Sequence, residues 1–181
     1  MRKVVAYELV SADGVAERPE TFVFDFDEVM YENLASVIGR QDTVLLGRGM
    51  YDEWAKYWPT SDDQPFADFI NGVQKYVATS SALATPWTNA SVIDGPVADF
   101  VRTMKSADGG DIGVHGSLRL TQSLFAAGLV DQLHLVIAPC VVGTGRHLVA
   151  SPDAFRKLRT ISSASAPTGS LLVHYEVDNS R

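Results

Sequence analysis

Short apolar runs alternate with segments of helical periodicity along most of this chain. The run at 3–11 is rich in strand-forming residues, and residues 25–39 then place apolar side chains at the spacing of one helix face. Later strand-like runs cover 43–47, 75–79, 90–94, 111–116 and 130–143. Helical segments are expected at 65–72, after Pro96 and over 117–128. Strands separated by helices usually pair in parallel within a sheet that helices cover on both faces.

The end of the chain breaks this alternation. Two strand-like runs, 159–164 and 170–177, flank Pro167-Thr168-Gly169, which is a hairpin signal. We therefore predict an α/β fold with three αβα layers and a mixed, mostly parallel sheet of about eight strands, closed by an antiparallel C-terminal hairpin. A length of 181 residues fits a single domain over 1–181.

Composition and charge argue against several classes of partner. A net charge of −7 and a pI near 5 disfavour a broad nucleic-acid surface. Cys140 is the only cysteine, so no intrachain disulfide can form, which fits the reducing cytoplasm where we expect the protein. No run approaches the ~20 apolar residues of a membrane span, so we expect no membrane partner. The histidines show no ligand spacing, and we predict no metal site at His115, His134, His147 or His174.

Three strand ends carry residues suited to an anion. They are Gly47-Arg48, Thr79-Ser80-Ser81 and His115-Gly116-Ser117. In parallel sheets, ligands bind where strand carboxyl ends meet helix N-termini, because the helix offers unpaired N–H groups and a positive dipole end. Three such places at equivalent positions in one sheet describe a groove for a ligand with several phosphates, such as a dinucleotide.

Each strand end also has a simpler interpretation. Gly47 lets a ligand approach the backbone and Arg48 presents a forked donor set that matches phosphate, but a tight turn with a solvated arginine explains both equally well. Hydroxyl-rich strand ends such as 79–81 are commonly turns. A lone glycine turn at Gly116 is weak evidence by itself.

Several longer segments carry a more specific pattern. They are VSADGVAE, DTVLLGRGMYDEW, KYVATSSAL, GGDIGVHGSLRLTQSLFAAGLVDQLHLVIAPCVVGTGRHL and the closing hairpin, in order across nearly the whole chain. This pattern resembles the dihydrofolate reductase-like superfamily. It is most similar to the branch of the C-terminal reductase domain of the bifunctional riboflavin-biosynthesis protein.

The resemblance implies an NADPH-dependent reductase that acts on a C=N or C=O bond of a small heterocyclic or carbonyl substrate. It implies kinship with 5-amino-6-(5-phosphoribosylamino)uracil reductase and dihydrofolate reductase, and a homodimer. The implied cofactor contacts are the turn Gly47, Arg48, Gly49 and Met50 for phosphate, the hydroxyls of Thr79, Ser80 and Ser81 for the adenosine 2′-phosphate, the backbone of His115, Gly116, Ser117 and Leu118 for the pyrophosphate, and the loop from Ala12 through Gly14 to Val15 for the nicotinamide.

The chain departs from the family at two positions. Met50 stands where the family usually has threonine, which removes a hydroxyl from the phosphate turn. Tyr31 aligns with the helix carboxylate that grips the pterin in dihydrofolate reductase, which argues against folate reduction. These departures favour an alternative: a nucleotide- or ligand-binding protein that kept the reductase fold without catalysis.

Reduction also calls for a proton donor and a substrate pocket. Asp13 is the first candidate acid or substrate anchor, although an Asp-Gly turn explains it equally well. Asp27 is the second, although an early-helix acid that complements the dipole is the favoured explanation. The aromatic side chains that could line a pocket for a flat ring, or belong to an ordinary core, are Tyr31, Trp54, Tyr57 and Trp58.

Overall fold

The computed structural model describes residues 1–149 and 155–180. Its strands are β1 (Val4–Ser11), β2 (Gln41–Gly47), β3 (Gln74–Ala78), β4 (Ala90–Val92), β5 (Asp111–Val114), β6 (Gln132–Ala138), β7 (Lys157–Ser165) and β8 (Leu171–Asp178). Its helices are α1 (Glu28–Ile38), α2 (Arg48–Tyr57), α3 (Phe66–Gly72), α4 (Val97–Ser106) and α5 (Leu118–Ala126), with short 3₁₀ turns η1 (Pro19–Thr21) and η2 (Trp58–Thr60).

The strands of the described residues form one sheet in the order β4-β3-β2-β5-β1-β6-β8-β7. From β4 to β6 in this order, each strand is parallel to the next. Strand β8 pairs antiparallel with β6, and β7 pairs antiparallel with β8. The predicted mixed sheet of eight strands with an antiparallel C-terminal hairpin is therefore confirmed.

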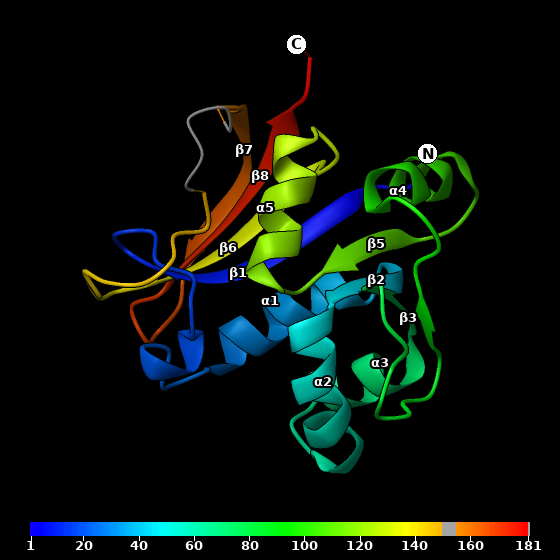
Figure 1. Ribbon diagram of the computed structural model, residues 1–181. Helices are drawn as coiled ribbons and strands as arrows, with labels where there is room; N and C mark the ends of the chain where they lie inside the picture. The colour runs from blue at the N-terminus through cyan, green and yellow to red at the C-terminus, as the bar shows by residue number, and fades with distance from the viewer. Residues whose placement is uncertain (150–154, 181) are drawn as a thin grey trace.

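Alternate side chains of β1 enter two different cores. Val4 and Ala6 pack with α4 and α5, whereas Val5 and Tyr7 pack with α1, α2 and α3. Successive side chains of a strand point to opposite faces of a sheet, so one central strand serves both cores. Figure 1 shows the result, with α4 and α5 on one face of the sheet and α1, α2 and α3 on the other. The three predicted layers are present.

Two element boundaries differ from the sequence prediction by three residues or more, and the others by no more than two. Helix α1 begins later than expected because the Asp27 carboxylate caps it, accepting a hydrogen bond from the Met30 N–H at 3.0 Å. Strand β6 ends at Ala138 and not at 143, because Pro139 has no N–H to donate to a neighbouring strand.

The order of the strands brings the three predicted strand ends together. Strand β2 lies between β3 and β5, so Gly47 at its end has Ala78 as its partner on one side. Leu45 of β2 pairs with Val114 on the other side. The turns that leave β2, β3 and β5 therefore share one edge of the sheet, and this edge holds the candidate site.

Candidate functional site

Two cavities open along this edge. The first, which we call the hydroxyl cavity, has a volume of about 650 Å³ and is lined by Thr79, Ser80, Ser81, Ala82, Val92, Ile93, Asp94, Gly95, Pro96 and Val97. The second, the aromatic cavity, has a volume of about 860 Å³. Its lining residues include Tyr7, Glu8, Leu9, Phe26, Tyr31, Gly49, Met50, Trp54, Trp58, Phe66, His115, Gly116, Ser117, Leu118 and Arg119. Both volumes lie in the range of small-molecule sites.

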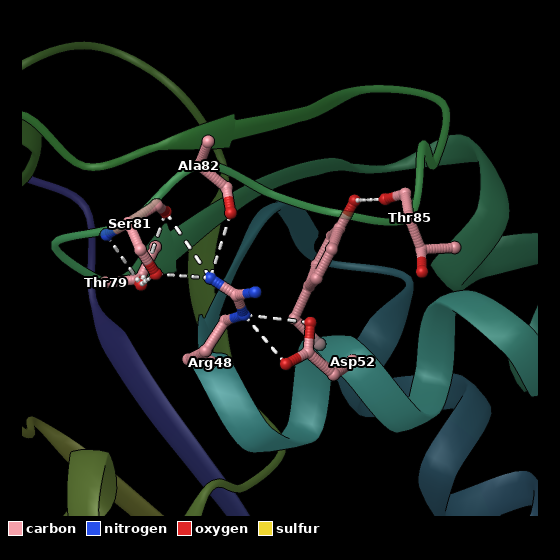
Figure 2. Close-up of polar contacts among 7 residues, drawn as sticks. Arg48, Asp52, Thr79, Ser81, Ala82 and Thr85 are labelled. Atoms are coloured by element: carbon pink, nitrogen blue, oxygen red, sulfur yellow. Dashed lines mark hydrogen bonds and ion pairs between the residues drawn. The ribbon is translucent and has the colours of Figure 1, made fainter.

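Arg48 connects the end of β2 to the loop after β3 (Figure 2). Its Nε donates to both carboxylate oxygens of Asp52, at 2.8 and 2.7 Å. Its Nη1 donates to the Ser81 hydroxyl at 2.6 Å and to the Ala82 carbonyl at 3.0 Å. Within the described residues Nη2 makes no hydrogen bond, so one amino group of the guanidinium is left for a ligand. The structure thus brings two of the three predicted segments into contact.

The loop after β3 is held to α2 at a second point. The Tyr51 hydroxyl donates to the Thr85 carbonyl at 2.6 Å, and Thr85 is visible beside α2 in Figure 2. Within the loop, the Ser81 N–H donates to the Thr79 hydroxyl at 3.2 Å. Ser80 lies between them, exposed and without a side-chain hydrogen bond among the described residues. The hydroxyl cavity therefore has a wall that α2 positions.

Both turns require glycine, Gly47 for close packing and Gly116 for its left-handed backbone conformation. A Cβ placed on Gly47 would lie 2.7 Å from the Cβ of Ser117, so only glycine lets the turn before α5 sit against the end of β2. Gly116 has φ of +96°, and a Cβ there would lie 2.8 Å from Cε of Met50. Met50 therefore packs against Gly116. The sequence showed only that Met50 replaces the threonine usual in the family, and it did not reveal this contact.

His115 presents its side chain to the layer of α1, α2 and α3. Its Nε2 lies 2.7 Å from Oε1 of Gln41, and its ring lies against Phe66 and Phe69 at 5.3 and 5.9 Å between centroids. Burial lowers the pKa of His115 to about 3, so the imidazole is neutral at pH 7. It therefore contributes shape and a hydrogen bond rather than positive charge.

Asp13 is used in joining two loops. Its carboxylate accepts hydrogen bonds from the Ser11 hydroxyl at 2.6 Å, from the Val142 N–H at 3.1 Å and from the Gly143 N–H at 2.8 Å. These hydrogen bonds, led by the one from Ser11, hold the pKa of Asp13 well below its usual range. Asp13 is not among the residues that line either cavity, nor are Ala12 and Gly14 beside it.

Asp27 caps α1 and also binds the C-terminal hairpin, where its second oxygen accepts the Thr168 N–H at 3.0 Å. Desolvation raises the pKa of Asp27, but hydrogen bonds from the backbone of Thr168 and Met30 outweigh it and lower the pKa overall. Neither cavity includes Asp27 among its lining residues. The structure gives both predicted acids positions away from the cavities and ionised carboxylates.

The predicted aromatic side chains divide into two groups. Trp54 and Trp58 line the aromatic cavity and pack edge-to-face at 5.8 Å, with Tyr31 at 40% exposure as a third wall residue. Tyr57 is not among the lining residues: it is exposed, and its hydroxyl donates to the cavity residue Asp63 at 2.6 Å. The Trp58 Nε1 is buried and lacks a hydrogen-bond partner among the described residues.

Glu8 was missed by the sequence reasoning. It lies on β1, is 7% exposed and lines the aromatic cavity. The Thr121 hydroxyl on α5 donates to its Oε1 at 2.6 Å. Burial raises the pKa of Glu8 to about 7, although the hydrogen bond from Thr121 opposes the shift. The available signal was a glutamate inside the strand-forming run 3–11, since strands of a parallel sheet are commonly buried on both faces.

Two further features concern only the described ranges 1–149 and 155–180. No helix there is long and apolar enough to cross a bilayer. No group of three or more His, Cys, Asp or Glu side chains is arranged to hold a metal ion in the same part of the chain.

A family model decides where this chain belongs. The model of the RibD C-terminal domain matches residues 2–172. The chain is a member of the RibD C-terminal domain family. The expected branch of the dihydrofolate reductase-like superfamily is therefore confirmed.

Individual proteins resemble this RibD C-terminal domain over most of its length. The Bacillus subtilis (strain 168) protein YyaP, itself uncharacterised, is 26% identical over 138 residues, which are 74% of this chain and 73% of YyaP. A Shewanella sp. PV-4 protein assigned provisionally to riboflavin biosynthesis superimposes with a TM-score of 0.76 at 13% identity, covering 97% of this chain and 99% of that one. Dihydrofolate reductase from Enterococcus faecalis, complexed with NADP(H), gives a TM-score of 0.65 at 11% identity over 97% and 96% of the two chains. The reductase-type family and the dihydrofolate reductase-like fold are thus established.

Proposed function

We propose that this protein is an NADPH-dependent reductase that reduces a C=N or C=O bond of a small heterocyclic or carbonyl substrate. The observation that carries the proposal is the position of Arg48 between the two cavities. Gly49 and Met50, which follow it on α2, line the aromatic cavity, whereas its hydrogen-bond partner Ser81 lines the hydroxyl cavity. A dinucleotide has two ends that match the two cavities: a phosphate-bearing adenosine for the hydroxyl cavity and a reactive ring for the aromatic cavity.

The residues present suit the phosphates of NADPH. Thr79, Ser80 and Ser81 line the hydroxyl cavity, and the Ser81 hydroxyl accepts a hydrogen bond from Nη1 of Arg48 at 2.6 Å. Helices α2 and α5 both begin at this edge without a side-chain cap, so their first N–H groups are open to an anion. Arg119, exposed on the first turn of α5, adds a second positive charge at the aromatic cavity. When bound, the cofactor would supply a hydride.

The aromatic cavity suits a flat, uncharged substrate ring. Trp54, Trp58 and Phe66 provide apolar walls, and edge-to-face packing at 5.5 Å between Trp54 and Phe66 fixes their relative orientation. The buried hydroxyl of Tyr7 and Nε1 of Trp58 have no partner among the described residues. Buried donors of this kind favour a ligand with acceptor atoms, such as ring carbonyls.

Titration with NADPH tests this function. The purified protein should enhance and shift the fluorescence of the reduced nicotinamide at micromolar cofactor. Absence of binding at millimolar NADPH would contradict the proposed function. Replacement of Arg48 should weaken this binding. Replacement of Arg102, which pairs with Asp99 at 2.8 Å on the exposed face of α4, is the matched control, because it also removes one positive charge from an ion pair.

A ligand-binding protein without catalysis is the second candidate. It is favoured by the ion pair of Arg48 with Asp52, which neutralises part of the charge intended for phosphate, and by the structural engagement of Asp13 and Asp27. Crystals soaked with NADPH would distinguish the two. A nicotinamide placed in the aromatic cavity supports the reductase, and a bound nucleotide that leaves this cavity empty supports the alternative.

A further inference from the structure

We propose that Glu8 is the acid that protonates the substrate at the reduced bond. This role rests on the proposed reductase function and adds to it the source of the proton. Glu8 is buried and lines the aromatic cavity from the face of the sheet that α5 covers, whereas Trp54 and Phe66 line it from the opposite face. The proposed position of the reduced bond is between them.

The position of Glu8 follows from the strand that carries it. It lies on the same face of β1 as Ala6 and Val10, which places its side chain under α5. There the Thr121 hydroxyl holds Oε1 at 2.6 Å, and Thr121 itself is 1% exposed. No residue of the described ranges hydrogen-bonds Oε2. One oxygen is therefore fixed in place while the other is left for a ligand.

No charge among the described residues pairs with Glu8. From β6, its register partner is the apolar Leu135. From the end of β5 comes His115, which burial keeps neutral at pH 7. The other titratable and charged groups at the cavity are the phenol of Tyr7, whose pKa burial raises, the phenol of Tyr31, the exposed Arg119 of α5, the exposed carboxylates of Glu53 and Asp63, and the loop pairs Arg146–Glu17 and Arg18–Glu20. Desolvation therefore dominates, and Glu8 holds a proton up to about neutral pH.

The other carboxyls of the aromatic cavity do not suit the role. Glu17 accepts hydrogen bonds from the backbone and guanidinium of Arg146, which lower its pKa and keep it ionised. Glu20, Glu53 and Asp63 are exposed at the mouth of the cavity. Glu8 is the buried carboxyl among the cavity residues that the structure describes.

The proton and electron balance is simple. The O–H bond of the Glu8 carboxylic acid breaks and its proton passes to the nitrogen or oxygen of the C=N or C=O bond. A bound reduced nicotinamide would supply the two electrons and the second hydrogen to the carbon as a hydride, and would itself be oxidised. The Glu8 carboxylate then regains a proton from water. A donor with a pKa near the working pH is the most effective for such a transfer.

Infrared titration of Glu8 tests the position without requiring turnover. A protonated carboxylic acid has a C=O stretching band that the carboxylate lacks, and this band should disappear with a midpoint near pH 7 in the free protein. It should be absent in Glu8→Gln and retained in the control Glu53→Gln. The oxidised nicotinamide carries a positive charge, so the midpoint should fall by roughly 1–3 pH units with bound NADP⁺ but not with bound NADPH.

The outcomes separate the two claims. Failure of the wild-type protein to bind either nucleotide contradicts the reductase function. Binding of both, with the same Glu8 midpoint in the NADP⁺ and NADPH complexes, shows that Glu8 does not face the nicotinamide and overturns its assignment as the acid. A midpoint lowered by NADP⁺ alone supports it.

Turnover gives a second readout once a probe is reduced. With 9,10-phenanthrenequinone or 7,8-dihydrofolate as the probe, Glu8→Gln should slow NADPH oxidation roughly 10²–10⁴-fold while the affinity for NADPH stays within about twofold. The wild-type rate should decline above pH 7, and the residual rate of Glu8→Gln should not. A Glu8→Gln rate within threefold of wild type, with the same pH profile, would overturn the role of Glu8.

Discussion

The two cavities at the carboxyl edge of the sheet differ in the kind of side chain that lines them. The hydroxyl cavity is lined on one side by the hydroxyl residues Thr79, Ser80 and Ser81 after β3, and on the other by a mostly apolar segment, residues 92–97. The aromatic cavity is lined by indole and phenyl rings and contains the buried carboxyl of Glu8. The hydroxyl cavity can hold a phosphate through hydrogen bonds from hydroxyl groups. The aromatic cavity contains a buried carboxyl group, Glu8, that can donate a proton to a substrate. The identity of the substrate therefore depends on the aromatic cavity.

Burial of Glu8 predicts the largest effect of pH on stability. Because its folded-state pKa is raised to about 7 from 4.5, the folded state binds more protons than the unfolded state between these values. The free energy of unfolding should therefore fall as pH rises from about 4.5 to 7, by about 3 kcal/mol, and level off above pH 7.

Urea unfolding at a series of pH values measures this effect. The difference between the wild-type protein and Glu8→Gln isolates the contribution of Glu8 from those of Asp13 and Asp27, which titrate at lower pH. A difference between the two proteins that does not change from pH 5 to pH 8 would mean that Glu8 is solvated and ionised in the folded state.

The contact between Gly47 and Ser117 predicts the next effect. Gly47→Ala forces a methyl group into the turn that precedes α5 and should lower the free energy of unfolding by about 1–3 kcal/mol. Gly49→Ala is the matched control two residues along α2, where an added Cβ meets nothing within 4 Å. It should stabilise the protein by roughly 0.5–1 kcal/mol, since alanine is the better helix former. Equal effects of the two substitutions on the urea midpoint would show that the turns do not pack as described.

Replacement of Arg48 should lower the affinity for NADPH. Arg48→Ala removes the free Nη2 and should weaken NADPH binding by roughly 10–100-fold, the size of one or two hydrogen bonds to a charged group. Arg102→Ala, which breaks a surface ion pair on α4, should leave the affinity unchanged. Fluorescence titration of the three proteins measures the effect. Equal affinities of Arg48→Ala and the wild-type protein would remove Arg48 from the phosphate site.

Ser80 should produce the smallest effect. It makes no hydrogen bond within the described residues, so Ser80→Ala removes a ligand contact without disturbing the loop. The preference for NADPH over NADH should fall roughly 2–10-fold. Ser91→Ala, on the exposed strand β4 and outside the cavity lining, is the control. An unchanged preference in Ser80→Ala would place the 2′-phosphate elsewhere.

Local pattern predicted the elements of the fold well. The helical spacing that begins near Phe26 and the apolar runs such as Thr43–Gly47 depend on neighbours in sequence, and both became elements close to their expected bounds. The order of the strands depends on contacts between distant segments. The insertion of β1 between β5 and β6 leaves no periodic signal in any one segment.

The difference between local sequence pattern and contacts between distant segments also explains which site residues could be predicted. The turn residues Gly47 and Gly116 were identified from their place after a strand, but their packing against Ser117 and Met50 needs the folded chain. Asp13 was chosen because it sits in a loop, and only the structure shows that its two backbone N–H partners, Val142 and Gly143, lie about 130 residues away along the chain. Glu8 was overlooked because its surroundings in sequence are those of an ordinary strand.

A crystal structure of the complex with NADPH tests the central claim most directly. The two-cavity site predicts the adenosine 2′-phosphate beside Ser80 and Ser81, the pyrophosphate at the N-termini of α2 and α5, and the nicotinamide in the aromatic cavity within contact distance of Glu8. A cofactor bound away from the carboxyl edge, or with its nicotinamide outside the aromatic cavity, would contradict it.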